Sequence, residues 1–405
     1  MIFPRKIFNE IEKCLFTEDI IVLHGARQVG KTYILYYIEN FLKDKKQKTY
    51  YIDLEDSRFV DIIDTGVDEF IKHLSEAGIL QSKSQKDKVF ILIDEIQYLE
   101  NPSSFLKLVA DHHKNIKLVV SGSSSFAIKS KFKDSLVGRT VNFEIFPLSF
   151  TEFLLFKKQP IDFSSQKKLT NKTIDELKKW FEEFTLYGGY PKIVLTKDVE
   201  LKEKYLQQII DTYIRKDIKD LADIREIDKF NKLLEVLASQ SGNLVEVLEL
   251  ANTCKLSRQT VENYLFILEN TYIIKLVRPY YRNIRSELSK TAKVFFYDSG
   301  LMQMLWLKQL QKEIIGNVFE TSVFAELVKR YGKENILYWR TADGKEIDFI
   351  IRIKNDLKAI EVKLNFERFD DTAIKYFRDK YESAYAVTAL EGDMKNKYYQ
   401  YPWEM

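Results

Sequence analysis

Short hydrophobic runs and helical patterns alternate over the first 150 residues of the chain. Continuous hydrophobic runs of this kind are typical of strands buried on both faces of a parallel sheet. The predicted strands are 20–24, 50–54, 88–95, 116–120 and 141–146. Between residues 33 and 42 the hydrophobic positions have helical spacing, and this helix directly follows the first strand. The pattern therefore predicts an α/β domain built on a parallel sheet.

The middle of the chain has a helical pattern. Residues 150–225 predict helices, interrupted by a charged loop at 157–168 and by a sharp break at 188–191, and we expect them to form a lid. From 230 to 278 the order is helix, helix, helix, hairpin, with Ser257 as a suitable N-cap for the third helix. This order is typical of a winged helix-turn-helix, whose third helix would enter a DNA major groove.

The last ninety residues alternate again between the two patterns. A helix begins at Gly316 and runs through Lys329. The predicted elements after it are strands at 336–340, 346–353 and 357–364, a helix at 370–381 and a strand at 384–388. Asn355 and Asp356 fit the turn of a hairpin between the second and third strands. The order α-β-β-β-α-β is that of the restriction-endonuclease-like fold.

Length, composition and charge restrict the class of protein but do not identify its function. A chain of 405 residues with 45% hydrophobic and 30% charged residues predicts a globular protein of two or three domains. The net charge is only +3, so nucleic-acid binding would need a local basic patch. Cys14 and Cys254 lie far apart, which argues against a disulfide scaffold or a zinc site. Because neither a signal peptide nor a membrane-spanning run is evident, we expect a cytoplasmic protein without a membrane partner.

The first strand leads into a complete G-x-x-x-x-G-K-[ST] phosphate-binding loop. The loop consists of Gly25, Ala26, Arg27, Gln28, Val29, Gly30, Lys31 and Thr32. Its backbone N–H groups can surround an anionic phosphate at a helix N-terminus, where the helix dipole also favours negative charge. Lys31 is expected to reach the β- and γ-phosphates, and Thr32 to bind Mg²⁺. The loop with a strand before it and a helix after it predicts a nucleotide-binding protein.

Acidic and hydroxyl residues follow two other strands of this sheet. Asp94 ends the run 88–95 and is expected to hold the Mg²⁺ water shell, while Glu95 is the candidate that polarises the attacking water. After the strand 116–120 comes a serine-rich segment that includes Ser123; it fits a γ-phosphate sensor or an ordinary turn capped by hydroxyl groups. Arg139 fits either an arginine finger that reaches a neighbouring subunit of a homo-oligomer or a solvated surface residue.

A second group of charged residues lies on the C-terminal elements. Glu361 and Lys363 are two residues apart on one strand and so point to the same face, and Asp348 on the paired strand can lie beside them. With Glu320 on the leading helix, these carboxylates would bind Mg²⁺, and Lys363 would orient or deprotonate a water molecule. The D…E-x-K spacing also occurs on ordinary amphipathic strands. The sequence therefore allows two interpretations, a catalytic site or charged residues without a catalytic role.

Two segments have residues suited to DNA. The third helix of the predicted winged helix carries the polar residues Ser257, Arg258, Gln259, Thr260 and Asn263. Between 278 and 293 there are five basic residues, Arg278, Arg282, Arg285, Lys290 and Lys293, interleaved with Tyr280 and Tyr281. Such a stretch can contact phosphates and stack on bases. Winged helices also serve as protein–protein spacers, which leaves DNA as one of two partner classes.

Several motifs, in their order along the chain, resemble one family. They are 25–32, the segment Leu92-Ile-Asp-Glu-Ile-Gln97, Ser121–Ser124, Gly138-Arg139, 147–152, Tyr187-Gly-Gly-Tyr-Pro191 and 213–218. They are similar to AAA-family (AAA+) P-loop ATPases of archaea and bacteria that carry a C-terminal domain of unknown function of the restriction-endonuclease-like PD-(D/E)xK clan. Ala26 stands where such loops more often carry proline, which leaves the phosphate cradle intact.

The resemblance implies four segments: an ATPase core at 1–150, a helical lid at 151–228, a winged helix-turn-helix at 229–292 and a nuclease-like domain at 293–405. It implies hydrolysis of ATP with Mg²⁺, in a protein that acts on DNA through its last two segments. The alternative is a nucleotide-dependent switch or scaffold that binds protein or nucleic acid without cutting it.

Overall fold

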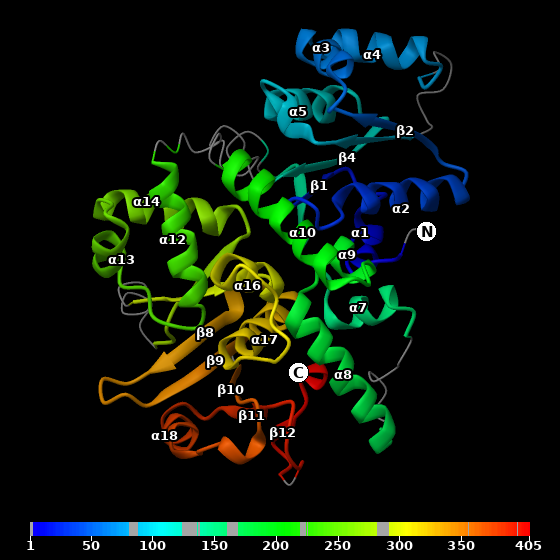
Figure 1. Cartoon of the computed structure of the whole chain (residues 1–405). Helices are drawn as coiled ribbons and strands as arrows, with labels where there is room; N and C mark the ends of the chain where they lie inside the picture. Colours follow the sequence, from blue (N-terminus) through cyan, green and yellow to red (C-terminus); the bar gives the residue numbers. More distant parts are fainter. Residues whose placement is uncertain are drawn as a thin grey trace. The chain divides into compact units, whose positions relative to one another are not determined.

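A computed structural model describes most of the chain, namely residues 3–80, 88–123, 136, 138–159, 169–218, 224, 226–281, 291–354, 356–394 and 396–405. It divides into two compact units (Figure 1). The first unit comprises Met1–Phe146 and Asn270–Tyr272, and the second comprises Pro147–Glu269 and Ile273–Met405. The division into four segments stays a prediction, because the lid, the three-helix segment and the C-terminal sheet lie within one of these units.

The first unit is built on a five-stranded parallel sheet. Its strands are β1 (Ile20–Gly25), β2 (Lys48–Asp53), β3 (Val89–Asp94), β4 (Ile116–Ser123) and β5 (Thr140–Glu144). They are ordered β2-β3-β4-β1-β5, and every neighbouring pair is parallel. All residues of β3 and β4 are buried, which explains the hydrophobic run of β3; in β4 the buried Lys117 interrupts the hydrophobic residues. The five strands predicted from the sequence are confirmed, each within a few residues of its expected bounds.

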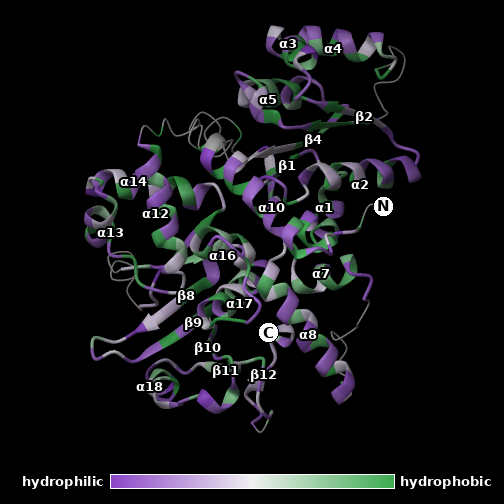
Figure 2. Cartoon of the chain, viewed as in Figure 1, coloured by the Kyte–Doolittle hydropathy of each residue, from purple (hydrophilic) through white to green (hydrophobic). Residues whose placement is uncertain are grey.

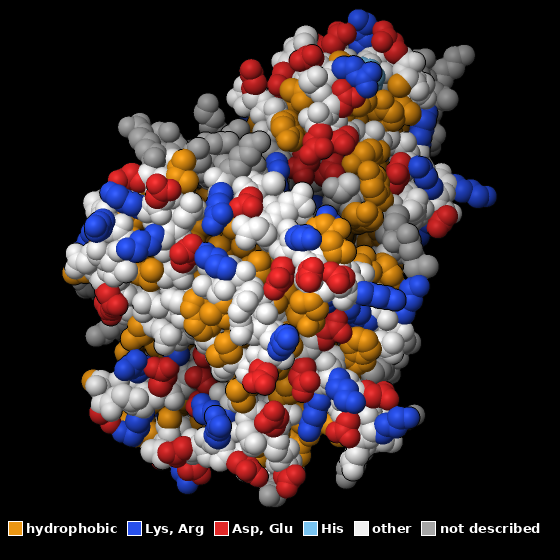
Figure 3. Space-filling model, viewed as in Figure 1, with side chains coloured by type: hydrophobic (Ala, Val, Ile, Leu, Met, Phe, Trp, Pro, Cys, Tyr) orange, Lys and Arg blue, Asp and Glu red, His pale blue; other side chains and the backbone are white. Residues whose placement is uncertain are grey.

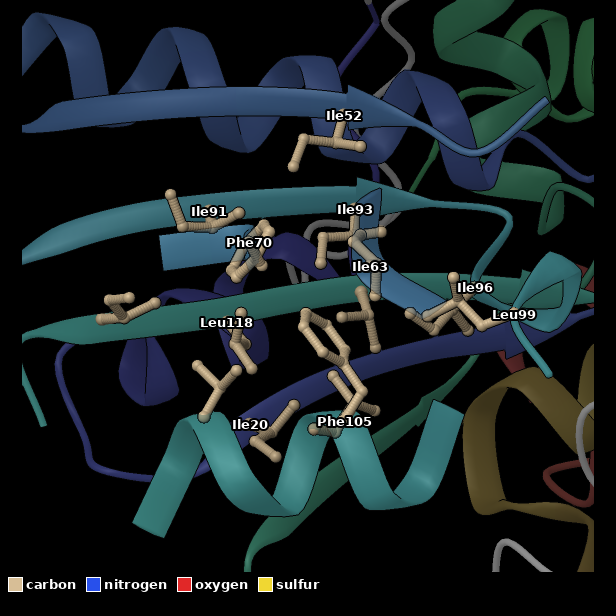
Figure 4. Packing of buried hydrophobic residues seen from close by; sticks show 14 of the residues in the cluster. Ile20, Ile52, Ile63, Phe70, Ile91, Ile93, Ile96, Leu99, Phe105 and Leu118 are labelled. Carbon is tan, nitrogen blue, oxygen red and sulfur yellow. The ribbon is translucent and has the colours of Figure 1, made fainter. Parts of the chain in front are cut away.

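Helices cover both faces of this sheet. The helices α1 (Phe8–Cys14) and α2 (Lys31–Asp44) contact each other through Phe8 and Tyr37, and α2 packs on the strands. On the other face lie α3 (Ser57–Thr65), α4 (Val67–Glu76) and α5 (Pro102–His112). Figure 4 shows Phe70 and Phe105 pointing toward Ile91 and Leu118 of the sheet. The helix α2 was predicted, whereas α1, α3, α4 and α5 were not assigned from the sequence.

The first half of the second unit is helical, as predicted. Its helices are α7 (Phe150–Phe156), α8 (Asn171–Tyr187), α9 (Pro191–Leu195), α10 (Val199–Ile209) and a π-helix at Ile210–Ile218. The break at 188–191 separates α8 from α9, and Gly188 has a left-handed φ of 78°. Three further helices follow, α12 (Ile227–Ser239), α13 (Val247–Cys254) and α14 (Arg258–Asn270).

Two antiparallel strands follow these three helices. The strand β6 (Ile274–Val277) pairs with β7 (Lys293–Phe296), so the predicted order of three helices and a hairpin is present. Because β7 begins at Lys293, this pair extends across the boundary that was expected after residue 292. The helix α16 (Ser299–Leu307), which the sequence analysis did not assign, comes next.

The C-terminal elements form a mixed sheet. They are α17 (Gly316–Tyr331), β8 (Ile336–Arg340), β9 (Glu346–Ile353), β10 (Asp356–Val362), α18 (Thr372–Tyr381), β11 (Ala384–Thr388) and β12 (Tyr399–Gln400), with short 3₁₀ turns at Lys333–Asn335, Phe366–Arg368 and Pro402–Glu404. The strand order is β12-β11-β10-β9-β8, antiparallel from β8 to β10 and parallel from β10 to β12. The predicted order α-β-β-β-α-β is confirmed, and β12 adds a strand.

Both faces of the C-terminal sheet are covered. Phe349 of β9 lies within ring-contact distance of Phe324 on α17 and of Phe295 on β7. On the opposite face, Phe377 of α18 packs against Trp339 of β8. The helix α17 therefore packs against β9, which is paired with β10, and these three elements carry the charged residues described below.

Hydropathy along the helices agrees with their position at the surface. Figure 2 shows hydrophilic and hydrophobic residues alternating along α3 and α4, and only Ile63, Phe70 and Leu74 of these two helices are buried. Across the described ranges, no helix combines the length and hydrophobicity that crossing a membrane requires.

Candidate functional site

The predicted phosphate-binding loop lies where β1 ends and α2 begins. Gln28 and Gly30 have left-handed φ angles of 62° and 99°, which bend the chain back before the helix. A Cβ atom added to Gly25 would lie 2.1 Å from the carbonyl oxygen of Ile145, so the residue after β5 can pack here only against glycine. One guanidinium nitrogen of Arg5 donates to Val29 O at 2.9 Å, and another donates to Phe146 O at 2.9 Å. The loop is thus held from both sides.

Lys31 is folded back onto the loop itself. Its Nζ donates to the carbonyl oxygens of Gly25 at 3.1 Å and Ala26 at 2.8 Å, and the residue is 4% exposed. Burial lowers the pKa of Lys31, while the nearby carboxylates of Glu95 and Asp94 act in the opposite direction. An anionic phosphate in the loop would offer this ammonium a stronger acceptor than two neutral carbonyl groups. Thr32, beside it, is the second residue of α2.

Asp94 is a buried carboxylate at the carboxyl end of β3. Its Oδ1 accepts a hydrogen bond from Ser121 Oγ on β4, and its Oδ2 accepts one from the hydroxyl of Tyr51 on β2 at 3.1 Å. Burial, followed by the charge of Asp94, raises the pKa of Tyr51, so that the phenol remains a donor. The sequence analysis named Ser121 only as part of the serine-rich segment and Tyr51 only as a strand residue. Their bonds to Asp94 depend on strand order and register, which the sequence alone does not give.

Glu95 follows directly and is tied to its surroundings at two points. Its backbone is left-handed, with φ 55°, and its N–H donates to Asp94 Oδ1 at 3.1 Å. Its side-chain Oε2 accepts a hydrogen bond from Gln97 Nε2, and Gln97 Oε1 accepts one from the backbone N–H of Ser123 at 3.1 Å. Gln97 was not singled out as a site residue, although it ends the motif Leu92–Gln97 and lies two residues after Glu95.

Sheet register brings the predicted nucleotide-site residues together at the carboxyl ends of the strands. Gly25 of β1 is the direct partner of Ser123 on β4, and Ile93 beside Asp94 is the partner of Val120 on β4. The loop, Asp94 and Ser123 therefore all lie at the carboxyl ends of adjacent parallel strands, where ligands bind in open α/β sheets. Ser124 and Ser125 of the predicted sensor segment lie outside the described residues.

Arg139 lies at the opposite end of the strands, directly before β5 begins. Its carbonyl oxygen accepts from Ile20 N at 2.8 Å, at the start of β1, which places it about 16 Å along the strand from the loop. Its guanidinium donates to both carboxylate oxygens of Asp111 on α5, at 2.8 and 3.2 Å. Arg139 is therefore not part of the loop's own surroundings, and its action on a neighbouring subunit stays a prediction.

In the second unit, the ends of β9 and β10 bring three predicted residues together. Lys363 Nζ lies 2.6 Å from Glu361 Oε1 and 3.6 Å from Asp348 Oδ2. Asp348 Oδ2 also accepts a hydrogen bond from Val362 N at 2.8 Å. The expected grouping of Asp348, Glu361 and Lys363 is confirmed, although β10 ends at Val362 and Lys363 lies just beyond the strand.

Glu320 of α17 is half-buried, and its carboxyl group interacts electrostatically with Asp348 and Lys363 of this group. Burial, and then repulsion from Asp348, raise its pKa to about 8, and the same two causes raise the pKa of Glu361 to about 7. Glu320 Oε1 and Glu361 Oε2 are buried without a hydrogen-bond partner. Two carboxyl oxygens in this condition favour either retained protons or a cationic ligand.

A buried lysine that the sequence analysis interpreted differently compensates part of this charge. Lys293 is 3% exposed, and its Nζ lies 2.5 Å from Glu346 Oε1. Burial acts to lower the pKa of Lys293, but the carboxylates of Glu320, Asp348 and Glu346 outweigh burial and raise it. The interpretation of Lys293 as part of a basic, DNA-facing stretch is therefore wrong, because β7 carries its side chain into the interior.

Hard oxygen ligands of the kind that Mg²⁺ prefers are present in this cluster, but their present arrangement does not form a metal site. Over the described part of the chain, no three His, Cys, Asp or Glu side chains are placed so that they could hold one metal ion. The ammonium group of Lys363 instead lies beside both Asp348 and Glu361. A metal role for Glu320, Asp348 and Glu361 would need that ammonium to move, and it stays a prediction.

The residues expected to contact DNA are partly accessible. On α14, Arg258, Gln259 and Asn263 are exposed, and Ser257 Oγ caps the helix by accepting from Thr260 N at 3.0 Å. Tyr280 instead packs edge-on against Tyr381, with ring centroids 5.2 Å apart. Arg282, Arg285 and Lys290 lie outside the described residues. On the face in Figure 3, basic and acidic side chains are interspersed.

Three family models match successive parts of the chain. An AAA domain matches residues 17–154, a domain of unknown function (DUF8612) matches residues 178–313, and another domain of unknown function (DUF4143) matches residues 315–403. The AAA match covers the loop 25–32, Asp94 and Glu95. The parallel sheet of the first unit is thus the sheet of an AAA domain.

Relatives in archaea and bacteria cover most of the chain. The uncharacterized protein MJ1544 of Methanocaldococcus jannaschii is 31% identical over 85% of this chain and 75% of its own length. An uncharacterized protein of Haemophilus influenzae is 28% identical over 89% of this chain and 86% of its own length.

Solved structures show a weaker likeness. AMPPCP-bound DnaA from Aquifex aeolicus aligns with a TM-score of 0.31 and 16% identity, over 65% of this chain and 87% of that chain. Cdc6p from Pyrobaculum aerophilum aligns with a TM-score of 0.29 and 14% identity, over 70% of this chain and 86% of that chain. Scores this low carry no argument about function.

Proposed function

Because the chain belongs to the family of AAA-domain proteins that includes MJ1544 of Methanocaldococcus jannaschii, we propose that its first unit binds ATP with Mg²⁺ and hydrolyses it. One observation carries this proposal. The loop 25–32 follows β1, and Asp94 and Glu95 lie at the carboxyl end of β3; these two parallel strands flank β4, so a phosphate chain at this end of the sheet can contact all three.

The residues of the loop would hold the phosphates. Backbone N–H groups at the start of α2 donate to phosphate oxygens, and Lys31 exchanges the carbonyl oxygens of Gly25 and Ala26 for the β- and γ-phosphates. The Thr32 hydroxyl and Asp94 suit Mg²⁺, because Asp94 is a buried hard oxygen donor whose orientation is held by Tyr51 and Ser121. When bound, Mg²⁺ offsets the charge of the phosphates.

Glu95 is the proposed general base. Its carboxylate takes a proton from a water molecule whose oxygen forms a bond to the γ-phosphorus, while the bond from that phosphorus to the β,γ-bridging oxygen breaks. The products are ADP and inorganic phosphate. Ser123 would bind near the γ-phosphate, since it lies beside Gly25 in the sheet.

Steady-state hydrolysis and nucleotide binding test this proposal in two variants. Lys31→Ala is expected to lose nucleotide binding, and Glu95→Gln is expected to bind ATP but lose hydrolysis by a factor of about 100 or more. Glu100→Gln, an exposed acid in the same segment, is the matched control and should behave as the wild type. Hydrolysis that survives both Lys31→Ala and Glu95→Gln would refute the assignment.

For the second unit we propose action on DNA. The three helices α12–α14 with the β6–β7 pair have the order of a winged helix-turn-helix, and α14 exposes Arg258, Gln259 and Asn263. The C-terminal helix and sheet have the order of the restriction-endonuclease-like fold. In this proposal the core, lid, winged helix and nuclease-like segments are those predicted from the sequence, with β7 included in the winged helix.

The cluster of Glu320, Asp348, Glu361 and Lys363 would be the nuclease site. Its two unpartnered carboxyl oxygens support a cationic ligand, and Lys363 is placed to orient a water molecule. The proposal predicts Mg²⁺- or Mn²⁺-dependent cleavage of DNA that is lost in Asp348→Ala and in Lys363→Ala. Metal-dependent cleavage that persists in both variants would point to a contaminant.

A nucleotide-dependent switch is the alternative function of the second unit. The position of the Lys363 ammonium beside Asp348 and Glu361 favours it, because this group already supplies a cation there. The switch predicts ATP-dependent oligomerisation or partner binding, with no metal-dependent cleavage of single-stranded, double-stranded or branched DNA. Measuring ATP hydrolysis with and without each form of DNA would show which partner the first unit responds to.

A further inference from the structure

We propose that Gln97 is a positioning residue of the ATPase site, which aims the Glu95 carboxylate and links it to the end of β4. The inference rests on the proposed hydrolysis of ATP and adds a residue to it. Gln97 lies on the 3₁₀ turn Ile96–Tyr98, directly after Glu95. It is half-buried, as Glu95 is, and its side chain bridges two structural elements.

Each end of the Gln97 amide makes a different hydrogen bond. Its Nε2 donates to Glu95 Oε2, and its Oε1 accepts from the backbone N–H of Ser123 at 3.1 Å. An amide can donate and accept at once, whereas a carboxylate only accepts and an ammonium only donates. Asparagine carries the same amide on a chain shorter by one methylene group. Glutamine thus supplies both the chemistry and the reach that this bridge requires.

The bridge ends beside the phosphate-binding loop. Ser123 is the register partner of Gly25, the first residue of that loop. The Gln97 side chain therefore connects the end of β4, where a phosphate in the loop would lie, to the carboxylate of Glu95. A second connection runs in parallel, because Ser121 of β4 donates to Asp94, whose carboxylate accepts from Glu95 N at 3.1 Å.

This arrangement restrains the general base without occupying it fully. Gln97 binds Oε2 of Glu95 and makes no hydrogen bond to Oε1, which in this proposal accepts the proton of the attacking water. A glutamate side chain has three rotatable bonds, and an unrestrained carboxylate would spend most of its time away from the productive position. Loss of a group that orients a catalytic ligand or base commonly lowers activity by a factor of about 10 to 100.

Two variants separate the two hydrogen bonds. Gln97→Glu has nearly the same shape and can still accept from Ser123 N, but it cannot donate to Glu95 and places a like charge beside it. Gln97→Met removes both hydrogen bonds at similar volume. The matched control is Gln207→Glu, because Gln207 Nε2 donates to the Asp211 carboxylate at 2.9 Å on a helix of the second unit.

The experiment measures kcat and KM for ATP, and the affinity for ADP, in the full chain. We expect kcat to fall by a factor of about 10 or more in Gln97→Glu and Gln97→Met, with KM and ADP affinity within about twofold of wild type. Gln207→Glu should leave all three unchanged. The inference is overturned if kcat of both Gln97 variants stays within about twofold of wild type, or if KM rises as much as kcat falls.

Glu95→Gln, measured beside them, distinguishes failure of the inference from failure of the proposed function. If the wild type hydrolyses ATP and Glu95→Gln does not, unchanged Gln97 variants overturn the positioning role alone. If the wild type does not hydrolyse ATP, the proposed function fails and the positioning role fails with it.

Discussion

The carbonyl oxygen of Ile145 approaches Gly25 so closely that a Cβ atom on Gly25 would lie 2.1 Å from it. Ile145 N also donates to His24 O at 2.7 Å, so the segment after β5 is bonded to β1 up to the first residue of the loop. The glycine that begins the phosphate-binding loop is thus required by backbone packing as well as by its role near a phosphate.

Replacing Gly25 with alanine should therefore damage folding and nucleotide binding together. We expect Gly25→Ala to lower the free energy of unfolding by about 1–3 kcal/mol, the usual cost of overpacking, and to abolish binding of ADP. Urea unfolding and calorimetric titration would measure the two effects. Gly316→Ala is the matched control, because nothing lies within 4 Å of a Cβ atom there. Normal ADP binding by Gly25→Ala would contradict this account of the loop.

The Arg139–Asp111 pair offers a test of the arginine-finger prediction. If Arg139 acts on a neighbouring subunit, Arg139→Ala should lower ATP hydrolysis by a factor of about 10³ at protein concentrations that support oligomers. Asp111→Ala, which removes the partner at 2.8 Å but keeps the arginine, should then retain hydrolysis. Equal and small effects of both variants on hydrolysis and thermal stability would show that the pair is only an exposed ion pair.

Lys293 should contribute to stability rather than to DNA binding. Lys293→Met leaves Glu346 without its buried partner and removes the cation that faces Glu320 and Asp348, so we expect a loss of about 3 kcal/mol in the free energy of unfolding. The double variant Lys293→Met with Glu346→Gln should recover part of that loss, because it leaves one carboxylate fewer. Lys308→Met, which breaks an exposed pair with Glu235, should cost no more than about 0.5 kcal/mol. A small loss in Lys293→Met would contradict the buried pairing.

Asp298 should make the second unit more stable in mild acid. It is fully buried at the start of α16, where it accepts from Gly189 N at 2.7 Å and Leu301 N at 2.9 Å, and burial raises its pKa to about 6. Because this pKa lies above the unfolded value, the folded state holds the proton more tightly. The stabilisation is complete below about pH 4 and is lost as the pH rises through about 6, a change of about 3 kcal/mol.

Urea midpoints between pH 4 and pH 7.5 would test this dependence. In Asp298→Asn, the urea midpoint should no longer show the decrease that the wild type shows as the pH rises through about 6. Asp198→Asn is the matched control, since Asp198 also caps a helix, accepting from Leu201 N at 2.8 Å, but is exposed. Identical pH curves for wild type and Asp298→Asn would refute the assignment.

Much of the fold was predictable from local patterns. The strands of the first unit and the C-terminal order α-β-β-β-α-β follow from their mostly hydrophobic segments, because a strand buried on both faces disfavours polar residues without a partner. The helices α3, α4 and α5 were not predicted, because a short amphipathic helix gives a weaker hydrophobic pattern than a continuous buried run. Arg139 could be proposed as a site residue, but its distance from the loop could not be predicted. That distance depends on which end of β1 lies beside Arg139.

The phosphate-binding loop, the place of Asp94 and Glu95 at the end of a strand, and the grouping of Asp348, Glu361 and Lys363 were all predictable from the amino-acid sequence. Each depends on residue type and on short spacing within one or two elements. The folded chain was needed to show that Gln97 bridges Glu95 to Ser123, that Tyr51 and Ser121 hold Asp94, and that Lys293 is buried beside Glu346. The physical reason is that these contacts join elements far apart in the chain. The sequence gives the type of each charged side chain, but strand order, register and packing determine its partner and its burial.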